Sequence, residues 1–122
     1  MGDSTYKVLC AVIFLVLISH GYSQCSLKDL SVTQQKTAVK VKGKPEWNVT
    51  ITNNCPCVQT NVKLNCVGFQ TVEPIDVTIF SVSGDSCLVN AGQPIYRDPI
   101  TFKYAWDNSF PLNPNSSVIA CS

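Results

Sequence analysis

The cysteines are the residues with the greatest chemical potential in this chain of 122 residues. Seven are present, and one of them, Cys10, lies in an apolar N-terminal stretch. The other six are Cys25, Cys55, Cys57, Cys66, Cys87 and Cys121. The N-terminal stretch predicts export, as described below, and six cysteines in a small exported chain are typical of three disulfides. A single proline separates Cys55 from Cys57 and would close a loop between them badly, so we expect each to bond elsewhere; the pairing is otherwise open.

Zinc binding is the alternative chemistry for a group of cysteines. Structural zinc sites are typically built from closely spaced cysteine pairs or from cysteine with histidine. The sequence has no C-x-x-C pair, and its single histidine, His20, lies in the same N-terminal stretch as Cys10. This stretch is predicted below to be removed as a signal peptide, and the rest of the chain has no histidine. The rest of the chain can therefore form neither a Ser-His-Asp nor a Cys-His nucleophile system. We therefore expect no metal, no cofactor and no catalytic residue.

The carboxylates form no recognisable catalytic pair. After residue 24 they are Asp29, Glu46, Glu73, Asp76, Asp85, Asp98 and Asp107. A glycosidase needs two carboxylates that flank the scissile bond, and no spacing here favours any two. The sequence has no D-x-D motif and no glycine-rich phosphate loop, and its net charge of +1 does not suggest a nucleic-acid-binding protein. The sequence therefore predicts a protein that is not an enzyme.

The N-terminal stretch has the layout of a secretory signal peptide. The segment Met1–Lys7, with one lysine, precedes the apolar run Val8–Ile18, and a small, polar segment follows. A membrane anchor is the alternative, but this apolar run would rise only about 16 Å as a helix, half of a ~30 Å hydrocarbon core. We predict cleavage after Ser23, which gives a signal peptide of residues 1–23 and one secreted domain of residues 24–122.

The elements that must position the cysteines are predicted to be β-strands. Apolar and polar residues alternate with a period of two in several segments, and none has the apolar period of an amphipathic helix. The predicted strands are Cys25–Gln35, Thr37–Lys42, Trp47–Asn53, Asn61–Cys66, Ile75–Val82, Cys87–Val89, Ile100–Trp106 and Ser117–Cys121. Short strands with turn residues between them predict an all-β fold. It is either a barrel or, as we expect, an antiparallel β-sandwich of about seven strands, braced by three disulfides.

The strand Trp47–Asn53 shows the alternation most clearly. Trp47 and Val49 are expected to point into the core, and Asn48 to point outward. Asn48 also begins Asn-Val-Thr, an N-glycosylation acceptor, and Asn115 begins a second, Asn-Ser-Ser, in a predicted loop. Both asparagines are predicted glycosylation sites, and a glycan on Asn48 would block the outer face of its strand.

Several stretches, taken together and in order, resemble a known family. They are Gly43–Trp47, Val49–Asn54 followed by Cys55 and Cys57, Cys66–Gln70, Cys87–Gly92, Phe102–Asp107 and Ile119–Ser122. In this order they resemble the Tapetum Determinant-like secreted proteins of plants, over nearly all of residues 24–122. The resemblance implies a secreted, cysteine-rich signalling ligand in the apoplast. Its implied partner is the ectodomain of a leucine-rich-repeat receptor kinase, because the founding member acts on such a receptor to specify cell fate in the anther.

The same stretches resemble, more faintly, plant carbohydrate-binding modules of β-sandwich type. Exposed aromatic rings stack on sugar faces, and the candidates are Trp47, Tyr104 and Trp106. The competing interpretation places these rings in the core, and we favour it for Trp47. Trp106 lies near a strand end beside Asp107, and for it both interpretations are left open. The alternative function is therefore an extracellular module that binds cell-wall polysaccharide.

Lysines form a second candidate binding feature. Between residues 28 and 44 the chain has one acid, Asp29, and five lysines: Lys28, Lys36, Lys40, Lys42 and Lys44. Edge lysines commonly discourage strand-on-strand aggregation. The functional interpretation is a basic patch that steers the protein to an acidic receptor surface or to wall polyuronates. Lys40 and Lys42, on the expected solvent face, join Trp106 as the predicted binding residues; no contact with nucleic acid is expected, nor with a membrane after signal cleavage.

Overall fold

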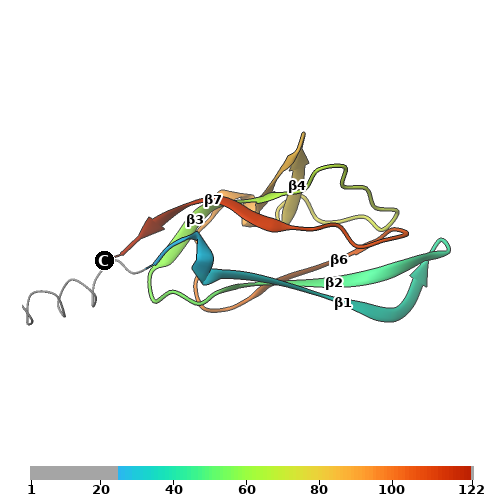
Figure 1. The fold of residues 1–122 in the computed structure, drawn as a ribbon, viewed down its shortest axis with the longest axis horizontal. Coiled ribbons are helices and arrows are strands. Elements are labelled where there is room, and N and C mark those ends of the chain that lie inside the picture. Colours follow the sequence, from blue (N-terminus) through green and yellow to red (C-terminus); the bar gives the residue numbers. More distant parts are fainter. Residues whose placement is uncertain (1–24, 122) are drawn as a thin grey trace, which may run out of the picture.

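Two antiparallel sheets face each other in the computed structural model, which describes residues 25–121 (Figure 1). One sheet has the strand order β1-β2-β6 and the other has the order β4-β5-β3-β7. The strands are β1 Leu30–Val41, β2 Lys44–Asn53, β3 Val58–Asn65, β4 Phe80–Ser83, β5 Ser86–Val89, β6 Ile100–Ala105 and β7 Asn113–Ala120. Short 3-10 helices span Leu27–Asp29 and Asn90–Gly92. The predicted seven-stranded sandwich is confirmed, and the predicted signal peptide, residues 1–23, lies outside the described residues.

β1 and β2 form a long hairpin with a tight turn at Lys42 and Gly43. Both residues have left-handed backbone angles, with φ of 50° and 81°, and such two-residue turns match the twist of the strands that they join. Where the sequence predicts two strands before this turn, the structure has the single strand β1, whose pairing with β2 shifts between Lys36 and Lys40. A bulge of this kind bends a strand without ending it.

The core lies between the two sheets. The three-stranded sheet contributes Val49, Ile51 and Tyr104, and the four-stranded sheet contributes Val62, Leu64 and Val89; all six are fully buried. Phe69, from the loop after β3, closes one side. Its ring centroid lies 5.2 Å from that of Phe80 and 5.0 Å from that of Tyr104, both in edge-to-face geometry, which aromatic pairs favour.

The segment Ile75–Val82 departs from its predicted strand. β4 begins only at Phe80, and Val77 is 69% exposed. The reason lies in Asp76, whose carboxylate accepts hydrogen bonds from the backbone N–H of Thr78 (2.9 Å) and from its hydroxyl (2.7 Å). This side-chain turn satisfies local backbone groups, so it competes successfully with an extended strand.

Three disulfides brace the sandwich: Cys25–Cys55, Cys57–Cys121 and Cys66–Cys87. The expectation that Cys55 and Cys57 have different partners is confirmed. The last bond ties β5 to the residue that follows β3, while the first two anchor the two ends of the described chain to the segment between β2 and β3. Among residues 25–121, no helix is both long enough and apolar enough to cross a membrane.

Candidate functional site

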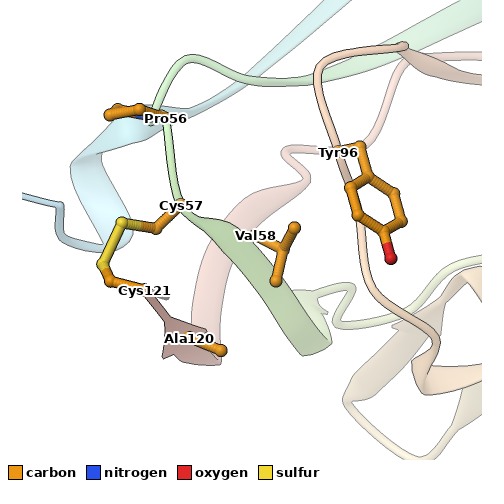
Figure 2. A pocket seen from close by; sticks show the side chains of 6 residues that line it. All are labelled: Pro56, Cys57, Val58, Tyr96, Ala120 and Cys121. Carbon is orange, nitrogen blue, oxygen red and sulfur yellow. A yellow bond between two sulfur atoms is a disulfide. The ribbon is translucent and has the colours of Figure 1, made fainter.

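An open groove lies where β3 begins and β7 ends. Its volume is about 440 Å³, and it is lined by Pro56, Cys57, Val58, Tyr96, Ala120 and Cys121. Figure 2 shows the Cys57–Cys121 disulfide on one side, the ring of Tyr96 on the other, and Val58 between them. A mostly apolar lining with few polar groups is typical of sites that bind a partner's apolar groups.

The register of β3 with β7 explains the apolar side of the groove. Val58 lies opposite Ala120, and Thr60 lies opposite Val118, so the four side chains share one face of the sheet. Gln59, between them on β3, is fully buried. Since successive side chains alternate, Val58 and Ala120 point away from the core.

Tyr96 lies on the same face for a similar reason. Ile95 forms an isolated antiparallel bridge with Gln59 and is buried. The next side chain, Tyr96, therefore points outward and is 62% exposed. Together these outward-facing residues form a surface that we call the Tyr96 face, which consists of Pro56, Val58, Tyr96, Val118 and Ala120.

A buried polar network holds the backbone under this face. The side chain of Asn53 donates to the carbonyl oxygens of Cys57 (2.9 Å) and Ile95 (2.9 Å). Its Oδ1 accepts from the backbone N–H of Cys55 (3.0 Å) and from Gln59 Nε2 (3.2 Å). Asn53 is only 2% exposed. One amide thus fixes both walls of the groove, because Cys57 and the residue before Tyr96 are bonded to it.

Tyr96, Asn53 and Gln59 were not predicted as site residues from the sequence. A signal existed for Asn53, which shares the period-two phase of Val49 and Ile51 and therefore points inward on β2. Tyr96 and Gln59 had no such signal, since the orientation of each depends on a bridge between residues distant in the sequence.

The predicted lysine patch is only partly assembled. Lys40 and Lys42 are exposed near the β1–β2 turn, which lies at the opposite end of the molecule from the C-terminal end of β7 (Figure 1). Lys44 forms an ion pair with Asp107 (2.9 Å), and the ammonium group of Lys36 lies over the ring of Trp47. Lys40 and Lys42 are therefore separated from the Tyr96 face, and their role in binding stays a prediction.

The two tryptophans are half-buried and pack against the core. Trp47 Nε1 donates a hydrogen bond to the carbonyl oxygen of Trp106 (3.4 Å). The ammonium groups of Lys36 and Lys44 lie 5.8 Å and 5.0 Å from the ring centroids of Trp47 and Trp106 respectively. Because Lys44 lies over the ring of Trp106, a sugar would have to stack on its other face or displace the lysine; sugar binding by Trp106 stays a prediction.

Tyr104, the third aromatic candidate, is fully buried. Its hydroxyl donates to the side chain of Gln34 and accepts from the backbone N–H of Phe110 (2.9 Å). Burial raises the pKa of Tyr104, which the bond from Phe110 partly offsets. Tyr104 is therefore a core residue that connects β6 to β1 and to the loop before β7.

The two glycosylation sequons lie on different sheets. Asn48 is half-buried in the central strand of the three-stranded sheet, opposite Gln35 and Lys103. Asn115 is exposed on β7, an edge strand of the other sheet; this position was predicted to lie in a loop. Glycosylation at either asparagine stays a prediction.

Two carboxyl groups, the buried Glu46 and the half-buried Glu73, lie near the other end of the sandwich. Glu46 is 5% exposed and accepts a hydrogen bond from the Thr37 hydroxyl (2.8 Å), which lowers the pKa of Glu46. Burial raises the pKa of Glu73, and the neighbouring Glu46 raises it further. Lys103 acts on both by lowering their pKa values. Glu73 Oε1 is buried without a hydrogen-bond partner among the described residues.

The fold and the disulfides define a small β-sandwich protein of the kind made in an oxidising compartment. The family model described as "Tapetum determinant 1, C-terminal" matches residues 26–122. The chain therefore belongs to the Tapetum determinant 1 family, whose members are known as small secreted signalling proteins. This confirms the resemblance seen in the sequence.

Two relatives from Arabidopsis thaliana match the chain. One, described as "Uncharacterized protein At1g05835", is 29% identical over 119 residues, which cover 93% of this chain and 94% of the relative. The other, "TPD1 protein homolog 1", is 32% identical over 93 residues, which cover 73% of this chain and 52% of the relative. The chain thus spans about half the length of that second relative. No solved structure matches.

Proposed function

We propose that this protein is a secreted signalling ligand that binds the ectodomain of a plant leucine-rich-repeat receptor kinase. Family membership supports a signalling role, and three disulfides support folding in the secretory pathway. The predicted signal peptide, residues 1–23, would direct the protein to the apoplast. The observation that carries the proposal is the Tyr96 face, an apolar surface that is exposed on a rigid framework.

The Tyr96 face has the properties of a protein-binding surface. Tyrosine is among the residues that most often dominate binding energy at interfaces, especially beside a pocket that excludes water. Here the ring of Tyr96 borders a groove with a volume of about 440 Å³. The Cys57–Cys121 disulfide and the Asn53 network fix the groove walls, so binding requires little ordering of the ligand. Tyr96 is therefore the proposed anchor.

The sequon at Asn48 is compatible with this surface. Asn48 lies on the outer face of the three-stranded sheet, and Tyr96 lies on the outer face of the other sheet. A glycan on Asn48 would cover the first face and leave the Tyr96 face free. The receptor is then expected to contact the Tyr96 face, with the extended concave surface of its repeats as the complementary shape.

A binding screen tests the proposed function. The secreted protein is presented to a panel of leucine-rich-repeat ectodomains and, in parallel, to cellulose and pectin affinity gels. We expect binding to an ectodomain at low micromolar affinity or better, and no retention on the gels. Retention on a gel that Trp106→Ala abolishes, without binding to any ectodomain, would overturn the proposal in favour of a carbohydrate-binding module.

A further inference from the structure

Sulfur atoms from two separate disulfides meet beside the groove. The Sγ atoms of Cys25, Cys55 and Cys57 all lie within 4.8 Å of one another, although Cys25 is bonded to Cys55 and Cys57 is bonded to Cys121. The cause is local, since one proline alone separates Cys55 from Cys57. Cys57 is therefore held next to a disulfide of which it is not a part.

The two disulfides differ in how accessible they are to an external thiol. Cys121, directly after β7, is exposed, whereas Cys25 and Cys57 are half-buried and Cys55 is only 2% exposed. Thiol–disulfide exchange requires the attacking thiolate to reach a sulfur atom of the bond. An external thiol therefore reaches the Cys57–Cys121 bond first, at Cys121.

A hydrogen bond prepares Cys55 to be a leaving group. The backbone N–H of Cys57 donates to Cys55 Sγ at 3.1 Å. When the Cys25–Cys55 bond breaks, negative charge develops on the departing sulfur, and a better-stabilised thiolate leaves faster. The same residue that would attack thus also stabilises the sulfur that would depart.

We propose that Cys25, Cys55 and Cys57 form a thiol–disulfide exchange site, which an external dithiol opens by reducing the Cys57–Cys121 bond. The dithiol loses two electrons and becomes a disulfide, while Cys57 and Cys121 become thiols. Cys57, after losing its proton, forms a bond with Cys25 Sγ. The Cys25–Cys55 bond breaks, and its electron pair leaves on Cys55 Sγ, which takes up a proton.

The product of this exchange is defined by the chain itself. Attack on Cys55 Sγ would join Cys55 to Cys57 across a single proline, which closes badly, so attack falls on Cys25. The product has a Cys25–Cys57 disulfide and thiols on Cys55 and Cys121. Because the Cys57–Cys121 bond lines the groove, exchange also releases the end of β7 and one wall of the groove. The inference stands independently of receptor binding.

Disulfide mapping of the native protein tests the exchange site. The folded protein is treated with a limited amount of dithiothreitol, free thiols are blocked with N-ethylmaleimide, and the links are assigned by fragmentation mass spectrometry. We expect an early product with a Cys25–Cys57 link and with label on Cys55 and Cys121. The fully buried Cys66–Cys87 bond is the internal control, and it should stay intact. Label confined to Cys57 and Cys121, or reduction of Cys25–Cys55 first, would overturn the proposal.

Two matched variants isolate the attacking sulfur. Cys121→Ser leaves Cys57 as a free thiol, so we expect a gain of the Cys25–Cys57 link without any reductant. Cys57→Ser leaves Cys121 free but removes the attacking sulfur, so the Cys25–Cys55 bond should be retained. Equal amounts of the Cys25–Cys55 bond in both variants, with no Cys25–Cys57 link in either, would contradict the proposal.

Discussion

Two neighbouring carboxyl groups, Glu46 and Glu73, give the protein a pH dependence that can be assigned to single residues. The folded-state pKa of Glu73 is raised above its ordinary value of 4.5, so its contribution to stability is present below that value and is lost as pH rises through the raised pKa. The pKa of Glu46 is lowered, so its contribution is present above 4.5 and is lost as pH falls through the lowered pKa. The two contributions are therefore present together near pH 4.5, and stability is lost on either side of it.

Replacing Glu73 tests this pair. In Glu73→Gln the side chain no longer titrates and its amide can donate to Glu46 at any pH, so we expect a smaller loss of thermal stability than in the wild type as pH rises above 4.5. Thermal unfolding followed by circular dichroism at a series of pH values measures the difference. Asp98→Asn, at an exposed carboxylate, is the control and should retain the wild-type profile. Identical profiles for Glu73→Gln and the wild type would show that the two carboxyl groups do not interact.

The adjacent asparagines Asn53 and Asn54 provide a second test at the scale of single residues. Asn53→Ala leaves the carbonyl of Cys57 and the N–H of Cys55 without the side chain that bonds them, and it also removes the bonds to Ile95 and Gln59, which we expect to cost about 2–4 kcal/mol of unfolding free energy. Asn54→Ala removes a hydrogen bond of an exposed side chain to Ser31 and should cost less than about 0.5 kcal/mol. Urea unfolding measures both; equal losses would contradict the assigned network.

At the scale of elements, local patterns predicted most strands, and tertiary contacts decided the exceptions. β5 and β6 lie within one residue of their predicted ranges, because β6 alternates apolar and polar residues and β5 is a short apolar segment. β2 ends at Asn53 as predicted but begins three residues earlier, at Lys44. β7 begins at Asn113, four residues before the predicted start. The segment Asn113–Ser116 has no apolar alternation, so its sequence does not predict a strand; its pairing with β3 makes it one. The groove was not predictable, because it requires the pairing of β3 with both β7 and Ile95.

One substitution in the β1–β2 turn, Lys42→Asn, should stabilise the hairpin. Lys42 has a left-handed backbone angle, with φ of 50°, which disfavours most side chains but is tolerated by asparagine. Lys42→Asn would create an Asn-Gly turn, the preferred sequence for this geometry, and we expect a gain of about 0.5–1 kcal/mol in unfolding free energy. Lys40→Asn, at a neighbouring strand position, is the control and should give no such gain. A loss of stability in Lys42→Asn would contradict the assigned turn.

The same hairpin also carries the predicted basic patch. If Lys40 and Lys42 steer the protein to an acidic receptor surface, the double charge reversal Lys40→Glu and Lys42→Glu should slow association and weaken its salt dependence, with less effect on dissociation. Surface plasmon resonance at several salt concentrations measures both rates. An unchanged association rate with unchanged salt dependence would leave these lysines as a solvated edge.

At the scale of the whole molecule, the sandwich separates three surfaces. One outer face carries Asn48, the far hairpin carries Lys40 and Lys42, and the Tyr96 face lies at the end closed by two disulfides. A domain this small offers little area to a partner, since a standard interface covers about 800 Å² on each side. We therefore expect one of these surfaces to dominate receptor binding, and the Tyr96 face combines an aromatic anchor with a rigid groove.

Titration calorimetry with the receptor ectodomain that the screen identifies tests this account most directly. Wild type, Tyr96→Ala and Val82→Ala are compared; Val82 is also exposed, at 52%, but lies on β4, outside the Tyr96 face. We predict that Tyr96→Ala weakens binding about tenfold or more, a loss of at least about 1.4 kcal/mol, and that Val82→Ala binds like the wild type. Full affinity in a correctly folded Tyr96→Ala protein would contradict the account.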